Sequence, residues 1–394
     1  MRWIEVPVMR LLLIHNTLND SVSISGVLRE YVNMARVWVA DGHTVDFLTG
    51  RVAHAQLKEL APECGRLSSD DLFDATAQLH QTWRNFPAYA WRCLSALRRP
   101  GAHYDLVYAT CPFVVETFCA RVIARRLGVP WGVKIQHVLG AQTQRSGWVN
   151  RLLLWGERRS AHWTAADAGF VFCLSPTVAR DYRALEDQLG LSASEAQTVG
   201  SSVDLDQFEL LPESAKKHDV VLLGRMHELK GVFDLPEVWA RVKAEQPDAT
   251  LKVVGEGPHR TAVMDQFARR KLMDGVEFTG GVSEANKNRL LAEARIGLSL
   301  SSEEGWGLAV NEYLACGLPV VAYELPVFRE VFPDVLRTVP LGDSAAVSES
   351  ILKLLKDPEA RLALGRKGRE YVQRYDYRSM AREEMRHLQA LGKS

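Results

Sequence analysis

The chain has 394 residues, of which 47% are hydrophobic and 24% are charged. This is the composition of a globular protein with two or three domains. Basic and acidic residues number 48 each, so the net charge favours no class of partner.

No apolar run approaches the roughly 20 residues of a membrane span. We expect no signal peptide, because the apolar run Val8–Ile14 is short and contains Arg10. Six cysteines without a C-x-x-C pair indicate reduced thiols in a cytoplasmic protein.

The first half of the chain alternates apolar runs that predict strands with segments that predict helices. Met9–His15 predicts the first strand, and a polar loop that reaches Gly26 leads into a helix over Val27–Ala40. A second strand is expected at Thr44–Thr49. A strand, a glycine-containing loop and a helix open many nucleotide-binding sheets, so this opening alone is weakly specific.

Positive charge gathers in residues 75–156, which hold ten lysines or arginines and only two acids. Residues 85–99 and 147–163 carry aromatic and aliphatic side chains at helical spacing beside arginines. Basic helices of this kind can lie on an anionic membrane. They can equally be ordinary amphipathic helices whose apolar stripe packs on the sheet. The residues leave both interpretations open, and we expect no nucleic-acid binding because no recognised module is present.

His137 ends the apolar run Trp131–His137, which predicts another strand. A histidine at the carboxyl end of a parallel strand lies where such sheets bind ligands. The alternative is a packed or solvated loop histidine, because position and not a motif supports the functional interpretation.

The second half begins with a strand at Asp219–Leu223, followed by Gly224-Arg225 and then Lys230-Gly231, with a helix expected from Val232. Fixed cations beside a helix N-terminus suit a diphosphate. The alternative is a solvated basic loop. Two further strands, at 250–254 and 276–278, end in glycine turns, and a helix is expected over residues 284–294. Those turns contain Gly255, Gly281 and Val282.

Residues 301–321 predict a tight turn, a helix and a strand after the apolar run Ile296–Leu300. The glycines of the turn let a ligand approach the backbone, and free amides at the start of the helix can bind an anion. Glu304 and Glu312 flank these amides with seven residues between them, and carboxylates there would suit sugar or ribose hydroxyls. The amides are those of Gly305, Trp306, Gly307 and Leu308.

This stretch resembles the E-x7-E signature of retaining glycosyltransferases of family four, including the A-C-G-x-P-V-V run that follows. The Gly224-Arg225 to Lys230-Gly231 segment resembles the family's donor-diphosphate loop, and Gly42-His43-Thr44-Val45 resembles the start of its second strand. The resemblance is strong from Val220 to Val331 and loose before Pro130. It implies an α/β protein of the GT-B fold, with two Rossmann-like domains whose parallel sheets face each other across a cleft.

The resemblance also implies the domain organisation. Residues 1–203 would form the acceptor-side domain and residues 204–375 the nucleotide-sugar-binding domain. Residues 376–394 would form a helix that crosses back to the first domain. Their charge pattern alone would indicate only a solvated surface helix.

The function implied is retaining, metal-independent transfer of a hexose from a UDP-, GDP- or ADP-linked donor to a glycan or lipid-linked acceptor. The catalytic residues would be Glu304, His137, Arg225 and Lys230. Donor contacts would come from the residues of the glycine turns, namely Glu312, Gly305, Trp306, Gly307, Leu308, Gly224, Gly255, Gly281 and Val282, with Gly26 in the first domain. No side chain is a convincing covalent nucleophile.

We expect no metal and no cofactor. Asp204-Leu205-Asp206 fits the D-x-D pattern of metal-dependent transferases, but it lies in the segment that resembles the interdomain link, so we interpret it as structural. The location expected is cytoplasmic, with peripheral contact on the inner face of the cell membrane through the basic 75–156 region.

Four alternatives remain. A non-catalytic nucleotide-sugar binder is disfavoured by the intact Glu304, Glu312, Arg225 and Lys230. A sugar-nucleotide epimerase would have the same architecture. A phosphorylase needs a pyridoxal-lysine site, for which no motif is present. A nicotinamide oxidoreductase is weaker, because no complete G-x-G-x-x-G follows the first strand.

Overall fold

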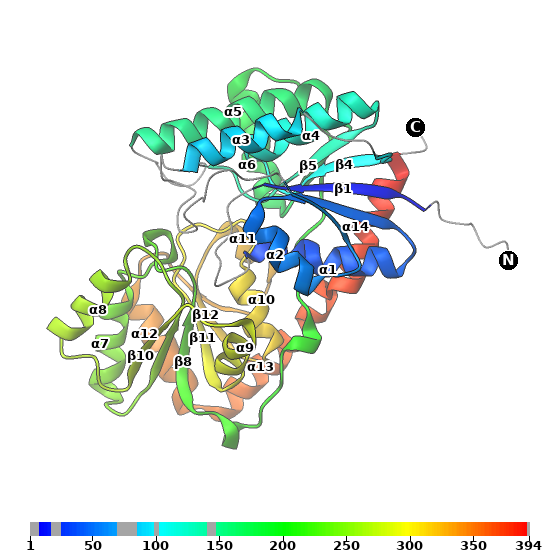
Figure 1. Cartoon of the computed structure of the whole chain (residues 1–394). Helices are drawn as coiled ribbons and strands as arrows, with labels where there is room; N and C mark the ends of the chain where they lie inside the picture. Colours follow the sequence, from blue (N-terminus) through cyan, green and yellow to red (C-terminus); the bar gives the residue numbers. More distant parts are fainter. Residues whose placement is uncertain (1–7, 17–24, 69–84, 98–101, 140–146, 392–394) are drawn as a thin grey trace. The chain divides into compact units, whose positions relative to one another are not determined.

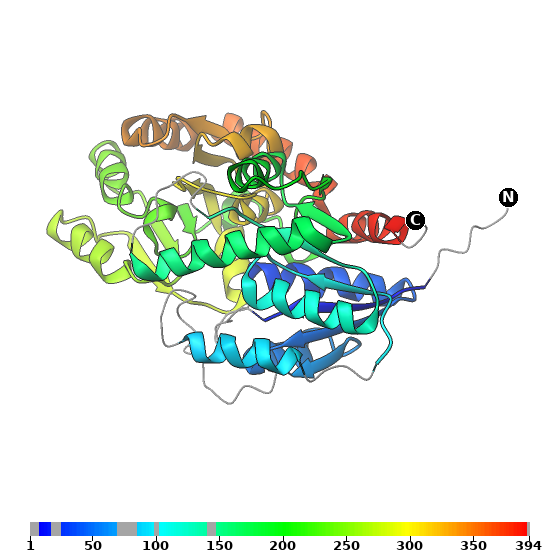
Figure 2. The same ribbon diagram turned by 90° about the horizontal axis from the view of Figure 1, so that it is seen from above.

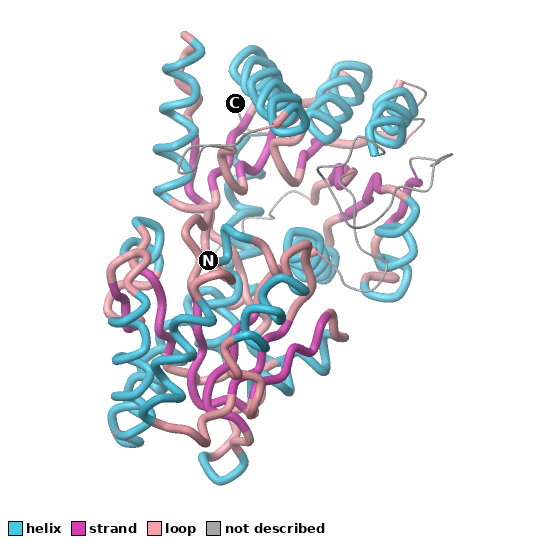
Figure 3. Tube along the Cα trace, turned by 90° about the vertical axis from the view of Figure 1, so that its left-hand side faces the viewer, coloured by secondary structure: helices cyan, strands magenta, loops and turns pink. Residues whose placement is uncertain are grey.

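The computed structural model describes residues 8–16, 25–68, 85–97, 102–139 and 147–391. The chain divides into two compact units (Figure 1). The first comprises residues 1–202 and 377–394, and the second comprises residues 203–376. Each unit contains a parallel sheet flanked by helices (Figure 3). The prediction of two Rossmann-like sheets is confirmed.

The first unit has a seven-stranded sheet in the order β3-β2-β1-β4-β5-β6-β7. Leu11 of the central strand pairs with Val45 on one side and Leu106 on the other, in parallel register. The inner strands are mostly apolar and buried, as expected for a parallel sheet covered on both faces. The strands are β1 (Arg10–His15), β2 (Thr44–Thr49), β3 (Gly65–Ser68), β4 (Leu106–Ala109), β5 (Trp131–Ile135), β6 (Phe170–Cys173) and β7 (Ala196–Thr198).

Seven helices of the first unit lie within the described ranges. The sequence did not predict α2 or the edge strand β3. The residues of β3 are half-buried and include a single apolar side chain, Leu67, so they form no apolar run to recognise. The predicted strand at Trp131–His137 ends two residues early, at Ile135. The helices are α1 (Gly26–Ala40), α2 (Arg51–Leu60), α3 (Phe86–Ala96), α4 (Val114–Leu127), α5 (Trp148–Asp167), α6 (Pro176–Leu189) and α14 (Tyr377–Leu391).

The C-terminal helix α14 belongs to the first unit, although the whole second unit precedes it in the sequence. Ala381, Met385 and Leu388 lie in the first unit's core. Trp38 of α1 donates a hydrogen bond from Nε1 to the carbonyl oxygen of Ala381, at 2.7 Å. The helix therefore completes the apolar core beside α1.

A buried ionic network joins α14 to the centre of the sheet. The ammonium of Lys134, on β5, lies 2.9 Å from Glu30 Oε1 of α1 and 3.1 Å from Glu384 Oε2 of α14. Tyr108 donates a hydrogen bond to the other oxygen of Glu384. Burial raises the pKa of Glu30 even beside Lys134. Burial also opposes the charge of Lys134, but the two carboxylates outweigh it and raise the pKa of the lysine.

The second unit has a six-stranded sheet in the order β10-β9-β8-β11-β12-β13. By chain order this matches the order at the centre of the first sheet, and it is the arrangement of Rossmann-type nucleotide-binding sheets. Val220 of β8 pairs with Leu251 and with Ile296, so β8 and β11 form the centre. The strands are β8 (His218–Leu223), β9 (Leu251–Val254), β10 (Val276–Gly280), β11 (Ala294–Ser299), β12 (Val320–Tyr323) and β13 (Arg337–Val339).

The helices of the second unit are mostly those that the sequence predicted, with shifted ends. The helix expected over 284–294 ends at Ala292, because the chain enters β11 at Ala294. The α-helices are α7 (Leu235–Glu245), α8 (Arg260–Arg269), α9 (Glu284–Ala292), α10 (Leu308–Ala315), α11 (Pro326–Val331), α12 (Ser344–Lys356) and α13 (Pro358–Val372). Short 3-10 turns are η2 (Leu205–Gln207), η3 (Glu213–Ala215), η4 (Glu228–Lys230) and η5 (Gln373–Tyr375).

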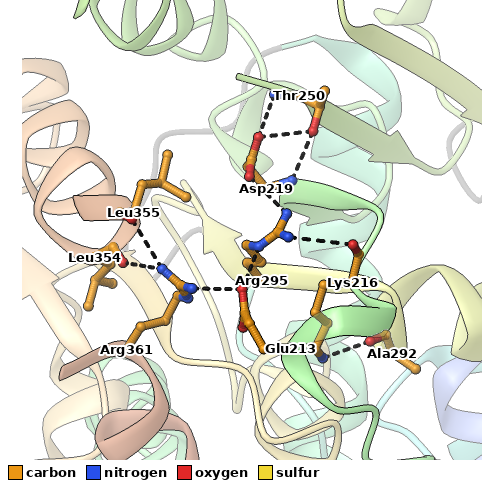
Figure 4. A network of polar contacts seen from close by, with 9 residues as sticks. All are labelled: Glu213, Lys216, Asp219, Thr250, Ala292, Arg295, Leu354, Leu355 and Arg361. Carbon is orange, nitrogen blue, oxygen red and sulfur yellow. Dashed lines mark hydrogen bonds and ion pairs between the residues drawn. The ribbon is translucent and has the colours of Figure 1, made fainter. Parts of the chain in front are cut away.

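A polar network holds the segment that leads into β8 (Figure 4). Glu213 of η3 accepts hydrogen bonds from Arg295 at 2.6 Å and from Arg361 at 2.7 Å. Arg295 also contacts Asp219, and Lys216 donates to the carbonyl oxygen of Ala292 at the end of α9. The segment from η3 to the start of β8 is thereby tied to β11, α9 and α13.

None of the six cysteines, all of which lie in described ranges, forms a disulfide, and all except the half-buried Cys93 are buried. Among the described helices, none combines the length and the apolar character needed to cross a bilayer.

We predict that Lys134→Met loosens α14. Without the ammonium, Glu30 and Glu384 would remain buried with no counter-charge, and breaking a buried pair in this way typically costs about 3–5 kcal/mol. We expect a lower melting temperature and faster hydrogen exchange in residues 377–391. Arg382→Ala is the control on the same helix, because Arg382 is exposed and forms a surface ion pair with Asp41. Unchanged exchange in Lys134→Met would contradict the prediction.

Candidate functional site

The stretch from β11 to β12 has the predicted order of strand, turn, helix and strand. Gly307 stands at the N-cap of α10 with φ +111°, a conformation that favours glycine. A Cβ on Gly307 would also come within 2.7 Å of the Phe328 ring. Gly317 follows the helix with φ +67°, as its position at a helix C-terminus predicts. The glycines therefore define both ends of α10.

Tyr313 fixes α10 beneath the sheet. Its hydroxyl donates to the carbonyl oxygen of Leu298 on β11 at 3.1 Å and accepts from the backbone N–H of Leu223 on β8. A Cβ on Gly297 would lie 2.5 Å from the tyrosine ring, so the strand needs glycine there. Burial raises the pKa of Tyr313, which keeps the hydroxyl protonated. This anchoring places the start of α10 at the carboxyl ends of the two central strands.

A lysine contacts each glutamate of the E-x7-E pair. Lys230 pairs with Oε1 of Glu304, which also accepts a hydrogen bond from the Ser301 hydroxyl at 2.8 Å. Lys287, on α9, pairs with Oε1 of Glu312. Both carboxylates are therefore held in place by fixed donors.

The loop after β8 differs from the prediction. The helix expected from Val232 begins at Leu235, because η4 occupies residues 228–230 and Gly231 follows it with φ +63°. A Cβ on Gly231 would lie 1.9 Å from the carbonyl oxygen of Leu300. Lys230 therefore ends a 3-10 turn packed on the end of β11, and α7 begins only at Leu235. Arg225 follows β8 with an exposed side chain.

Three predicted glycine turns come together at the carboxyl edge of the sheet. Gly224 follows β8, Gly255 follows β9, and Gly281 with Val282 follows β10. The amide of Gly255 donates to the carbonyl oxygen of Gly280 at 3.0 Å. A Cβ on Gly255 would lie 2.1 Å from the carbonyl oxygen of Gly224. The backbones of these turns therefore pack closely at the edge, and the Glu256 side chain lies against Gly280 and Gly281.

Trp306 has a structural side chain. It is buried and packs edge-on against Tyr375, with ring centroids 4.9 Å apart, and against Phe332. Because the side chain is used in packing, only the backbone amide of Trp306 could take part in the anion binding that the sequence predicted. Leu308 begins α10 with a partly exposed side chain.

His137 and Gly26 belong to the first unit, whereas the other predicted site residues belong to the second. His137 is half-buried, two residues beyond the end of β5. Gly26 is the first residue of α1, where the Ser25 hydroxyl accepts a hydrogen bond from the Leu28 amide at 3.2 Å.

The Asp204-Leu205-Asp206 segment forms η2. Asp204 caps this turn by accepting hydrogen bonds from the Asp206 amide at 3.2 Å and from Gln207 Nε2 at 2.7 Å. This local role agrees with the structural interpretation of the motif. Within the described ranges, no group of three or more histidine, cysteine, aspartate or glutamate side chains is placed to hold a metal ion.

Sequence reasoning missed two residues of the site, Ser301 and Lys287. The spacing of Glu284 and Lys287 on α9 could have indicated an ion pair one helical turn apart. Nothing in the sequence indicates the contact of Lys287 with Glu312, because that contact depends on how α9 and α10 pack. Ser301 could have been suspected from its place three residues before Glu304.

A second candidate surface lies on α3 and α5, which both pack against α4 (Figure 2). Trp148 and Trp155 of α5 are 50% and 57% exposed, and Leu94 of α3 is 52% exposed. The Phe86 and Trp148 rings, 6.3 Å apart, link the two helices. The buried side of α5 is instead small or polar, and its residues are Gly156, Glu157, Ser160, Ala161 and Thr164. The apolar stripe therefore faces away from the sheet, which contradicts the packed-stripe alternative for α5.

The positive charge of residues 75–156 is partly compensated. Lys134 is buried between two glutamates. Arg92 is buried and donates to the carbonyl oxygen of Asn16. Arg121 and Arg125 pair with Asp167, an acid outside the region. The predicted excess of charge is therefore smaller at the surface than in the sequence.

Two family models match the chain. The model described as glycosyl transferases group 1 matches residues 205–371, and the glycosyl transferase 4-like domain matches residues 25–187.

The chain is 30% identical to the phosphatidyl-myo-inositol mannosyltransferase of Mycobacterium leprae over 207 residues, which are 50% of this chain and 54% of that protein. It is 30% identical to the N-acetyl-alpha-D-glucosaminyl L-malate synthase of Bacillus anthracis over 39% of this chain and 40% of that protein. The chain thus spans about half the length of the curated relatives it matches.

Solved structures with the same fold cover nearly the whole chain. Anabaena HepE in complex with UDP-glucose superposes with a TM-score of 0.73 at 16% identity, over 97% of this chain and 100% of that one. Sucrose-phosphate synthase from Thermosynechococcus elongatus has a TM-score of 0.79 at 19% identity, over 97% and 99%. At these identities the likeness establishes the fold, which is GT-B. With both units matched by their family models, the chain belongs to the glycosyl transferases group 1 family.

Proposed function

We propose that the chain is a retaining, metal-independent glycosyltransferase that moves a hexose from a nucleotide-sugar donor to a glycan or lipid-linked acceptor. The observation that carries this proposal is the pair of lysine-held carboxylates, Glu304 and Glu312, on either side of the glycine-capped start of α10. The relatives named phosphatidyl-myo-inositol mannosyltransferase and N-acetyl-alpha-D-glucosaminyl L-malate synthase support a sugar-transfer reaction.

In this proposal the second unit binds the donor. Lys230, Arg225 and the amides from Gly305 to Leu308 would stabilise charge on the departing diphosphate, which is a role that a metal ion performs in other transferases. Lys230 lies against Glu304, so one ammonium can contact both the sugar-binding carboxylate and the diphosphate. Glu304 would hold sugar hydroxyls and Glu312 the ribose. The role of His137 in the first unit stays a prediction.

Retention of the anomeric configuration is proposed from the family resemblance, and the contacts of the two glutamates argue against a covalent glycosyl-enzyme intermediate. Each already accepts an ammonium donor, and a carboxylate engaged in this way suits hydroxyl binding more than covalent attack. Attack by the acceptor on the face that the diphosphate leaves is the mechanism that the family resemblance implies.

An anionic membrane is the partner that we propose for the surface of α3 and α5. The exposed side of α5 combines Trp148, Leu152 and Trp155 with Arg151, Arg158 and Arg159. Its acids are elsewhere, since Glu157 is buried against the Leu139 amide and Asp167 pairs with arginines of α4. Aromatic rings flanked by arginines that pair with no acid among the described residues suit the interface of a bilayer that carries negative charge. A lipid-linked acceptor on the cytoplasmic face would then be within reach of the protein.

The donor site predicts a metal-independent thermal shift. Among UDP, GDP and ADP, we expect one to raise the melting temperature equally with EDTA or magnesium, because binding to the folded state alone stabilises it by about 2.7 kcal/mol at a hundredfold excess over Kd. Arg225→Ala and Lys230→Ala should abolish the shift. Lys252→Ala, which removes an ion pair with Glu277 at the sheet edge, should keep it. A shift that requires magnesium would contradict metal independence, and no shift with any nucleotide would contradict the donor site.

The retaining mechanism predicts the anomer of the first product. When the matching nucleotide sugar is hydrolysed slowly without an acceptor, we expect the released sugar to have the donor's anomeric configuration. Proton NMR spectra recorded before mutarotation would identify it. The opposite anomer would show inversion. Glu304→Gln should reduce this hydrolysis by about a hundredfold or more, because losing one preorganised transition-state contact usually has that effect. This variant is the control for a contaminating hydrolase, whose activity would not depend on Glu304.

The membrane proposal predicts binding to vesicles that contain phosphatidylglycerol and not to vesicles of phosphatidylcholine alone. Replacing Arg151, Arg158 and Arg159 by glutamine should weaken binding about a hundredfold, because each basic residue near an anionic surface contributes about 1 kcal/mol. Replacing Trp148 and Trp155 by serine should also weaken it. Leu362→Ser, an exposed leucine of the second unit, is the control. Equal sedimentation of all variants would contradict the assignment of this surface.

A further inference from the structure

Lys287 is an enclosed cation next to the second glutamate of the signature. Only 9% of the residue is exposed. Its ammonium lies 2.9 Å from Glu284 Oε2 on the same helix and pairs with Glu312 Oε1 on α10. The Phe208 ring covers it from another side, with its centroid 5.7 Å away. All four residues belong to the second unit.

Burial of this lysine depends on the two carboxylates. Burial by itself lowers the pKa of Lys287, but Glu312 and then Glu284 outweigh it, so the pKa is raised and the lysine stays charged. Two carboxylates that touch one ammonium lie close enough to repel each other once the ammonium is removed. Lys287 therefore determines where the Glu312 carboxylate can lie.

Only one oxygen of Glu312 is used in this contact. Oε1 pairs with Lys287, and within the described part of the chain no hydrogen bond to Oε2 is seen. A carboxylate anchored through one oxygen presents the other in a fixed direction. A neighbouring pair of hydroxyl donors, such as the 2′ and 3′ hydroxyls of a ribose, matches such an acceptor.

We propose that Lys287 is a positioning residue that orients Glu312 toward the ribose of a ribonucleoside diphosphate, and that it thereby makes the site prefer the ribonucleotide to its 2′,3′-dideoxy analogue. This inference rests on the proposed donor site. It assigns to α9 a part in nucleotide selection.

Calorimetric titrations with the ribonucleoside diphosphate that binds best among UDP, GDP and ADP, and with its 2′,3′-dideoxy form, would test this role. The wild-type chain should bind the ribonucleotide at least about tenfold more tightly, the effect of one charge-assisted hydrogen bond. Lys287→Met should bring the ratio of the two affinities close to one by weakening the ribonucleotide alone. In a Glu312→Gln background, Lys287→Met should change the ratio no further, because the two residues act as a unit.

Lys216→Met is the matched control, because Lys216 also contacts α9, at the Ala292 carbonyl, and has no contact with Glu312. Its ratio should equal that of the wild type. Lys287→Gln keeps a hydrogen-bond donor and guards against misfolding of the methionine variant, and its ratio should fall about threefold. A wild-type ratio in a folded Lys287 variant would overturn the inference while leaving the donor site intact. Failure of the wild-type chain to bind any of the three nucleotides would overturn both.

Discussion

Three lysines, each in contact with at least one carboxylate, lie at the points on which the rest of the structure depends. Lys134 joins β5 to α1 and α14 in the first unit. Lys230 and Lys287 hold the two glutamates of the signature in the second unit. The cost of removing an ion from water explains why each lysine touches a carboxylate that would otherwise be unpaired. In the first unit this pairing stabilises the fold, whereas in the second it shapes a candidate ligand site.

Local features of the sequence predicted the second unit well, because they depend on near neighbours along the chain. Apolar runs indicated β11 and β12, and glycines at 307 and 317 indicated the ends of α10. Helix α7 was expected from Val232, directly after Gly231, which is three residues early. In the structure Gly231 adopts a left-handed conformation and ends η4. Pro236 stands in the first turn of α7. The difference between these two arrangements depends on contact with Leu300, which the sequence does not show.

Contacts between segments far apart in the sequence could not be predicted, because they depend on how the helices pack in the folded protein. Periodicity along residues 147–163 revealed an apolar stripe, but periodicity does not say which side of a helix packs inward. The small residues Gly156, Ser160 and Ala161 settle this, because they allow α5 to approach α4 closely and leave the tryptophans outside. The pairing of Lys287 with Glu312 could likewise not be predicted, because the strand order of the folded sheet determines that α9 and α10 lie side by side.

The return of α14 to the first unit has a consequence for biosynthesis. The second unit begins and ends at one place, since Val203 bridges to Asp376 and its amide donates to the carbonyl oxygen of Tyr375. All of its strands are therefore available once residue 376 has left the ribosome. The first unit, by contrast, lacks the partner of Trp38 and one partner of Lys134 until residues 377–391 have been made. The half of the protein that is translated first thus completes its core last, and the nascent chain carries an incomplete first unit throughout synthesis of the second.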